Sequence, residues 1–327
     1  MRFQDRLGIL VKARGVATLL SVVNGKSQMK YGIIVNPVSG KLSIDSKIRK
    51  LKKVARILGN DCVIGGIDTE SKEQFCDCAR DLAEKANVLI IAGGDGTASD
   101  VINAVDSEAV LSYLPFGSGC ALRYALNMPF GINKIAKQIR DGKEHSLDLI
   151  LCDNSRKAFM TSIGLEAAIL QERRDLRKYG IKGPPAYAIA TIHQILIDYK
   201  RVDTTITVDG ETFTVPHALT TIVTKIPYYG YRMKIVPYAE FGDGRLHLLA
   251  INANQTDVMH SVVGSFIDKK IFRKLLIDQN LLGEYKGGKS IQVTTKEERY
   301  LQTDGDLYRK GTEFKFEVLP GALKMRY

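Results

Sequence analysis

The amino-acid sequence predicts an α/β domain built on a parallel sheet, followed by a domain of short antiparallel strands. In the first half, apolar runs rich in β-branched residues alternate with amphipathic segments, and three of these runs end in small or polar loops. After Asp148 the sequence pattern is different: short β-like segments follow one another, and turn signals such as Asp209-Gly210 separate them. We expect a basic extension over 1–30, an α/β domain over 31–148 and a β-rich domain over 149–327.

Each element follows from its own pattern. Runs of apolar residues predict strands, and a 3.6-residue repeat of apolar positions predicts helices. In the first half the expected strands are 31–35, 62–67, 88–92 and 110–115, and the expected helices are 45–58 and 71–84. In the second half the expected strands are 147–151, 158–163, 204–209, 212–215, 219–225, 246–251, 290–295, 300–303 and 313–318, and the expected helices are 167–179 and 184–201.

Composition narrows the class of partner. The formal net charge of +11 favours a polyanionic partner, which is nucleic acid, nucleotide phosphate or an anionic membrane surface. Nucleic acid is the least favoured of these, since no recognised binding motif accompanies the charge. Five cysteines without a framework spacing indicate free thiols in a reducing compartment, and we expect a cytoplasmic protein. The basic, acid-poor residues 1–30 are compatible with a targeting peptide, a membrane-surface helix or one more packed element.

The stretch Gly93-Gly94-Asp95-Gly96-Thr97 follows a buried strand and precedes a helix-like pattern. Glycine lets the backbone approach a ligand closely, and the free amides at a helix start favour a phosphate. A carboxylate in that turn would repel phosphate unless it holds a metal ion or a hydroxyl. Asp95 therefore favours Mg-nucleotide chemistry over passive anion binding. An ordinary α/β turn is the alternative interpretation.

Two more strand ends carry loops of the same kind. Asn36-Pro37-Val38-Ser39-Gly40 follows the first expected strand, and Phe116-Gly117-Ser118-Gly119 follows the fourth. Open α/β sheets bind ligands outside the carboxyl ends of their strands, so these loops are expected at one site.

Five short motifs occur in order along the chain. They are Asn36-Pro37-x-Ser39-Gly40, Gly93-Gly94-Asp95-Gly96-Thr97, Pro115-x-Gly117-Ser118-Gly119, Pro227-Tyr228-Tyr229-Gly230 and Asp304-Gly305-Asp306. With these motifs the chain resembles, over about residues 31–327, the diacylglycerol kinase catalytic family, which includes bacterial diacylglycerol kinases, YegS-like lipid kinases and sphingosine kinases. The resemblance implies an NAD-kinase-like α/β domain, a β-sandwich domain and ATP bound in the cleft between them.

The resemblance also implies roles for individual residues. Asp304 would be the general base that accepts the proton of a lipid hydroxyl, with Asp306 and Asp95 as further catalytic carboxylates. A structural Mg²⁺ would be held by the Asp243 carboxylate and by the carbonyls of Glu240 and Arg245. The ATP-binding residues would be Asn36, Pro37, Ser39, Gly40, Thr69, Gly93, Gly94, Asp95, Gly96, Thr97, Asp100, Gly117 and Ser118.

Local alternatives remain for two of these assignments. Asp304-Gly305 is by itself a strong hairpin signal, and Asp243-Gly244 is compatible with a plain turn. The chain also departs from the family pattern. Cys120 and Ala121 stand where many members have Asn-Asp, and Lys225-Ile226 stands where a small polar pair often precedes Pro-Tyr-Tyr-Gly.

The predicted function is therefore an ATP- and Mg²⁺-dependent lipid kinase, peripheral to an anionic membrane surface. Basic clusters at 173–178 and 269–274 would provide the docking charge. The alternatives are a soluble NAD-kinase-like nucleotide kinase and a catalytically impaired nucleotide- or lipid-binding homologue. A homodimer is compatible with the sequence.

Overall fold

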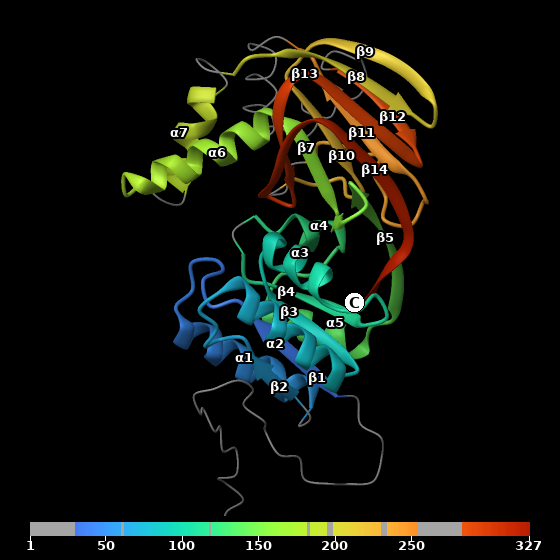
Figure 1. Ribbon diagram of the computed structural model, residues 1–327. Helices are drawn as coiled ribbons and strands as arrows, with labels where there is room; N and C mark the ends of the chain where they lie inside the picture. Colours follow the sequence, from blue (N-terminus) through green and yellow to red (C-terminus); the bar gives the residue numbers. More distant parts are fainter. Residues whose placement is uncertain are drawn as a thin grey trace, which may run out of the picture. The chain divides into compact units, whose positions relative to one another are not determined.

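The computed structural model describes residues 30–59, 62–117, 119–181, 184–194, 199–229, 234–253 and 283–327 (Figure 1). The chain divides into two compact units. The described part of the first unit runs to Leu147 and includes Gly321–Tyr327. The second unit covers Asp148–Tyr229 and the later described residues up to Pro320.

The first unit is built on a parallel sheet. Its strands are β1 (Tyr31–Val35), β2 (Cys62–Gly65), β3 (Val88–Gly93) and β4 (Val110–Pro115). They lie in the order β2-β1-β3-β4, and the end of the long strand β14 (Asp306–Arg326) lies parallel beside β4. Every residue of β1 and β3 is buried, as expected for parallel strands covered on both faces.

Helices follow these strands. They are α1 (Ile44–Leu58), α2 (Lys72–Lys85), α3 (Asp95–Ala104), α4 (Ala121–Ala125) and α5 (Ile132–Asp141). Serine caps begin the first two, since Ser43 accepts the amide of Ser46 and Ser71 accepts that of Gln74. Helix α1 packs with α5, and α2 packs with α3.

The strand order has a functional consequence. From β1 the chain moves outward to β2, then returns past β1 to β3 and continues to β4. The direction of winding therefore reverses between β1 and β3. In doubly wound sheets, the carboxyl ends of the two strands at such a switch point flank the ligand site.

The second unit is antiparallel in its described pairings. Besides β14, its strands are β5 (Glu144–Cys152), β6 (Arg156–Ala158), β7 (Met160–Gly164), β8 (Val202–Val208), β9 (Glu211–Ala218), β10 (Thr220–Thr224), β11 (Leu246–Ile251), β12 (Gly283–Gly288) and β13 (Ser290–Thr303).

Strand β13 connects the parts of this unit, because it pairs with three other strands. Its first half pairs with β8, its last residues pair with β7, and its pairing with β14 shifts register between Thr294 and Arg299. The strands of this unit share one core, in which Ile206, Val223 and Phe316 are buried together. The unit is thus a β-sandwich, and the predicted fold class of a parallel α/β domain followed by an antiparallel β domain is confirmed.

Two helices project from the second unit beside β7 (Figure 1). They are α6 (Leu165–Lys178) and α7 (Pro184–His193), which pack on each other. Leu165, Ile169 and Ala190 form a small core with Leu219. The helix predicted over 184–201 is therefore too long, since α7 ends at His193 and residues 199–201 are not helical.

Other predicted elements differ in extent: the strand predicted over 313–318 is only part of β14, and the strand predicted over 158–163 is divided between β6 and β7. The strands predicted over 290–295 and 300–303 form the single strand β13, because an irregular register rather than a turn separates them. Helix α5 and strand β12 were not predicted. Helix α5 carries Ile132, Ile135 and Ile139 at helical spacing, so its signal was present, whereas the glycine-rich and largely exposed β12 has no apolar alternation.

Candidate functional site

The loop after β1 is tied to the helix that follows β3. Asn36 donates from Nδ2 to the Thr97 hydroxyl at 3.0 Å, and its own amide donates to the Ala92 carbonyl at 3.2 Å. Its Oδ1 accepts the Val38 amide at 3.0 Å, which closes a tight polar turn. The two loops at the topological switch point therefore form one connected structure.

A buried lysine on α1 stabilises the same loop by donating hydrogen bonds to its backbone. The Lys47 side chain is only 1% exposed, and its ammonium donates to the carbonyls of Asn36 at 3.0 Å and Pro37 at 2.7 Å. Burial lowers its pKa. Lys47 was not predicted, although its position in the sequence carries a signal. It lies four residues before Leu51 and seven before Val54, on the buried face of α1.

The three glycine-containing loops approach each other at van der Waals distance. A Cβ on Gly40, whose φ is +69°, would lie 1.9 Å from the Phe116 carbonyl oxygen. A Cβ on Gly117 would lie 2.5 Å from the Cα of Gly94. Only glycine permits these approaches, so the loops after β1, β3 and β4 form a backbone cradle. Gly94 also precedes α3 without a side chain that could cap the first-turn amides, which is the arrangement that suits a phosphate.

Asp95 has a position that the sequence did not predict. Its two carboxylate oxygens accept the amides of Ala121 at 2.9 Å and Leu122 at 3.1 Å, so it caps the short helix α4 and links two of the glycine loops. Burial raises its pKa, and these amides oppose that rise. Cys120 precedes α4 in the left-handed region at φ 46°, and burial raises the pKa of its thiol to about 11.

The other predicted ATP-binding residues take several positions. Ser39 lies in the loop after β1, and Gly93 permits Thr97 to pack against the end of β3. The Thr69 hydroxyl donates to the Gly66 carbonyl within its own turn, and Asp100 forms an ion pair with Lys72. Gly96 lies in the first turn of α3. Ser118 lies outside the described residues.

In the second unit, Asp304 lies in the hairpin between β13 and β14. Asp304 and Gly305 have φ angles of 51° and 90°, which suits a two-residue turn of the primed type. The Asp304 side chain is nevertheless buried, and its Oδ1 accepts the amides of Phe159 and Met160, both at 3.0 Å. Its own amide donates to the Met160 carbonyl at 2.9 Å. The carboxylate is therefore fixed against the start of β7, whereas Asp306 is exposed.

A glutamine that the sequence did not single out supports this hairpin. The buried Gln302 accepts the Gly305 amide at 2.9 Å and donates to the Ser162 hydroxyl at 2.9 Å. It also donates to the Tyr229 hydroxyl at 3.4 Å. The Pro227-Tyr228-Tyr229 motif and the Asp304 hairpin, which are far apart in sequence, therefore meet through one side chain.

Two of the three residues predicted to hold a structural Mg²⁺, Asp243 and Arg245, contact a lysine instead. The Lys225 ammonium lies 2.5 Å from Asp243 Oδ1 and 2.6 Å from the Arg245 carbonyl oxygen. Burial would raise the pKa of Asp243, but hydrogen bonds from Lys225 and the Arg245 amide hold it below its usual value. Glu240 is exposed. A site that already contains an ammonium group does not fit a bound divalent ion.

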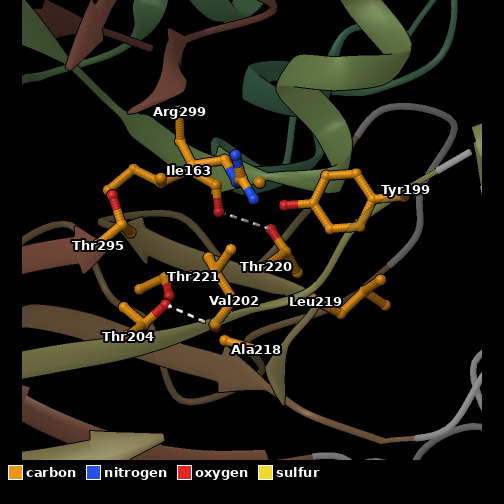
Figure 2. A pocket seen from close by; sticks show the side chains of 11 residues that line it. Ile163, Tyr199, Val202, Thr204, Ala218, Leu219, Thr220, Thr221, Thr295 and Arg299 are labelled. Carbon is orange, nitrogen blue, oxygen red and sulfur yellow. Dashed lines mark hydrogen bonds between the residues drawn. The ribbon is translucent and has the colours of Figure 1, made fainter. Parts of the chain in front are cut away.

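A small pocket also lies in this unit, near the end of β7 (Figure 2). Ile163, Gly164 and Thr220 contribute to its lining, and the Thr220 hydroxyl donates to the Ile163 carbonyl at 3.3 Å. Asp304 contacts the opposite end of the same strand, at Met160. The pocket therefore does not include the Asp304 carboxylate.

Comparison with known families accounts for both units. The family model of the diacylglycerol kinase catalytic domain matches residues 30–152, and that of the YegS C-terminal NAD kinase beta sandwich-like domain matches residues 160–326. The chain therefore belongs to the family in which a diacylglycerol kinase catalytic domain precedes a YegS-type C-terminal domain, and the model of the C-terminal domain alone matches more than half of the chain. This is a family of lipid kinases, so the predicted enzyme class is confirmed, and family membership implies ATP as the phosphoryl donor.

Individual relatives agree with this assignment. Diacylglycerol kinase of Staphylococcus saprophyticus is 27% identical over 284 residues, which covers 84% of this chain and 88% of the relative. Diacylglycerol kinase of Staphylococcus carnosus is 24% identical over 278 residues, with 84% and 87% covered. The crystal structure of a diacylglycerol kinase from Bacillus anthracis has a TM-score of 0.70 at 23% identity, over 92% of this chain and 98% of that one, and supports the fold.

Within the described ranges, no group of three or more His, Cys, Asp or Glu side chains is placed to hold a metal ion. In the same part of the chain, no helix is both long and apolar enough to cross a membrane.

Proposed function

We propose that this lipid kinase transfers the γ-phosphoryl group of ATP to the hydroxyl of a membrane lipid such as diacylglycerol or a sphingoid base, with Asp304 as the general base. The observation that carries the proposal is the buried Asp304 carboxylate, which two amides fix in one orientation. A general base must be preorganised, because proton transfer depends on geometry before it depends on pKa.

The glycine cradle provides the donor half of the reaction. ATP enters as its Mg²⁺ complex, and the amides of the loops and of the α3 start bind its phosphates. The lipid oxygen forms a bond to the γ-phosphorus while the bond to the β-phosphate oxygen breaks, and ADP leaves. The hydroxyl proton passes to the Asp304 carboxylate. Positioning and charge neutralisation supply most of the catalysis in such transfers.

We further propose peripheral association with an anionic membrane from the cytoplasmic side. The last turns of α6 expose Arg174, Arg177 and Lys178, and the neighbouring Tyr179 is 81% exposed. Basic residues beside an exposed aromatic side chain suit the interface of an anionic bilayer. The second basic cluster of the sequence, at 269–274, lies outside the described residues.

The acceptor is identified by a panel assay. The purified protein is given Mg-ATP labelled in the γ-phosphate, with anionic vesicles containing diacylglycerol, sphingosine or ceramide, or with NAD in solution. We expect a phosphorylated lipid. Phosphorylation of NAD alone would favour the nucleotide-kinase alternative, and ATP binding without any product would favour an impaired homologue.

The base is tested by Asp304→Asn, with Asp209→Asn as the matched control in the other Asp-Gly hairpin. Asparagine keeps the shape and the acceptor oxygen for both amides but cannot take a proton. We expect kcat to fall about 10²- to 10⁴-fold in Asp304→Asn with an unchanged KM for ATP. Asp209→Asn should retain the original rate. Full activity of Asp304→Asn would refute the assignment of the base.

The donor site is tested by Gly117→Ala. The new Cβ would lie 2.5 Å from the Cα of Gly94, so the cradle must open. We expect the Kd for ATP, measured by calorimetry, to rise at least about tenfold, which is 1.4 kcal/mol. Gly287→Ala is the control, because its Cβ would make only an ordinary contact at 3.7 Å. Unchanged ATP affinity in folded Gly117→Ala would contradict the assignment of the cradle.

A further inference from the structure

Lys225 is the most unusual charged residue in the described part of the second unit. Its side chain is 0% exposed, although lysine is almost never fully buried without partners. It follows β10, and its ammonium has three oxygen neighbours: Asp243 Oδ1 at 2.5 Å, the Arg245 carbonyl at 2.6 Å and Asp148 Oδ2 at 3.0 Å. An ammonium has three N–H donors, so each donor has one acceptor.

The acceptors come from separate parts of the chain. Asp148 lies on β5, whereas Asp243 and Arg245 lie in the loop that leads into β11. Both carboxylates have additional partners within that loop. Asp148 Oδ2 accepts the Gly244 amide at 2.9 Å, and Asp243 Oδ1 accepts the Arg245 amide at 3.1 Å. The ammonium is therefore the centre of a cluster that fastens the loop 240–245 to strand β5 and to the end of strand β10.

A histidine completes the cluster on its other side. His247 Nε2 lies 2.7 Å from Asp243 Oδ2, and His247 Nδ1 lies 2.7 Å from the Tyr285 hydroxyl. Each Asp243 oxygen therefore has its own partner, Lys225 on one side and His247 on the other. This arrangement holds the carboxylate in one orientation without any bound ion.

The geometry is that of an ammonium group and not of a divalent cation. The three oxygens lie 2.5–3.0 Å from the lysine nitrogen, whereas Mg²⁺ requires oxygens at about 2.0–2.1 Å in octahedral arrangement. Lysine fills the space between the ligands, so an ion could enter only if this side chain left. The carboxylate and carbonyl donors are nevertheless those that a hard divalent cation prefers.

We propose that Lys225 is a built-in cation that replaces a bound divalent metal ion in the loop 240–245, so that the second unit of this protein holds this loop without metal. The Asp243 carboxylate and the Arg245 carbonyl, which were expected to bind Mg²⁺, both contact the lysine. This inference concerns the structural cation of the second unit. It does not depend on which lipid accepts the phosphoryl group.

The cluster also reaches the candidate base through the backbone. The Lys225 amide donates to the Phe159 carbonyl at 2.8 Å, and the Phe159 amide donates to Asp304 Oδ1 at 3.0 Å. The Phe159 ring meets the Phe241 ring edge to face, with centroids 6.3 Å apart. The residue that carries the internal cation therefore also bonds, through its backbone, to the segment against which Asp304 is held.

The test measures thermal unfolding of the full chain without nucleotide, in metal-free buffer with EDTA and again with millimolar Mg²⁺, Mn²⁺ or Ca²⁺. For the original protein we expect the same Tm in every buffer, within about 1 °C. In Lys225→Ser and Lys225→Ala, the buried Asp148 carboxylate and the partly exposed Asp243 carboxylate lose their counter-charge, so Tm in EDTA should fall by about 5–10 °C. A divalent ion should restore at least half of that loss.

Lys47→Ala is the matched control. Lys47 is also buried, but the hydrogen-bond acceptors of its ammonium are the carbonyls of Asn36 and Pro37 and no carboxylate. A divalent ion should not restore the Tm that Lys47→Ala loses. The proposal is overturned if EDTA lowers the Tm of the original protein and Mg²⁺ restores it. It is equally overturned if metal fails to rescue both Lys225 variants, or if neither variant folds with or without metal.

Discussion

The two Asp-Gly hairpins of the second unit share one local structure and differ in what surrounds it. Asp209 and Gly210 have φ angles of 48° and 92°, and Asp304 and Gly305 have 51° and 90°. Asp209 is exposed, and its carboxylate accepts the amides of Lys289 and Ser290 at the start of β13. Asp304 is only 7% exposed and is fixed against β7.

The comparison shows which property the dipeptide encodes. Aspartate tolerates the left-handed region better than most residues do, and both glycines adopt a positive φ without strain. The sequence therefore predicts the turn in both places. Burial of one carboxylate depends on the strands that pack around it, so the candidate base is distinguished by tertiary structure and not by the Asp-Gly signal.

Replacing each aspartate with alanine, in two separate variants, should give the largest difference in stability between the two hairpins. Asp304→Ala leaves the buried amides of Phe159 and Met160 without their acceptor, and each unsatisfied group costs about 1–3 kcal/mol. We expect a loss of about 2–4 kcal/mol in the free energy of unfolding. Asp209→Ala should lose less than about 1 kcal/mol, because water can reach the exposed amides. Urea unfolding measures both, and equal losses would show that burial does not separate the hairpins.

Replacing the glycine of either hairpin should have a smaller effect on stability, and the effect should be the same in both hairpins. A Cβ at Gly210 or at Gly305 meets nothing within 4 Å, so only the positive φ opposes alanine. Gly210→Ala and Gly305→Ala should each lose about 1–2 kcal/mol of unfolding free energy. Gly287→Ala, in a strand with ordinary backbone angles, is the control and should lose little. Losses that differ more than twofold between the hairpins would contradict the view that their backbones are equivalent.

Local sequence patterns predicted much of the fold. The strands β1, β4 and β11 begin and end where the apolar runs do, because such runs have few other stable structures in an α/β or sandwich fold. The return of β14 to the first unit had no signal, since pairing of Lys324 and Met325 with β4 depends on contacts distant in sequence.

The candidate site was predicted in the same uneven way. The glycine cradle was foreseen because each glycine acts through its own backbone. The positions of Lys225 and Gln302 could not be foreseen. Lys225 contacts Asp148 and Asp243, and Gln302 contacts Ser162 and Tyr229. These partners are distant in sequence and come together only in the folded sheet.

The smallest expected effect concerns a third residue in the left-handed region. Cys120 has a φ of 46°, close to that of the two aspartates, but a thiol bonds the local backbone less well than a carboxylate or an amide does. Its Sγ donates to the Gly117 carbonyl at 3.2 Å, and the Tyr113 hydroxyl borders it. Asparagine would offer a stronger donor to the carbonyl and an acceptor to the hydroxyl, and it tolerates this backbone better than cysteine.

Cys120→Asn should therefore raise the free energy of unfolding by about 0.5–1 kcal/mol, measured in urea. Cys120→Ala is the control, because it keeps the unfavourable φ and removes the hydrogen bond, and it should be less stable than the original. If Cys120→Asn is destabilised as much as Cys120→Ala, packing of the buried thiol outweighs the backbone preference. The backbone preference of a residue for the left-handed region would then decide stability only where the side chain is exposed or already hydrogen-bonded, as at the two hairpins.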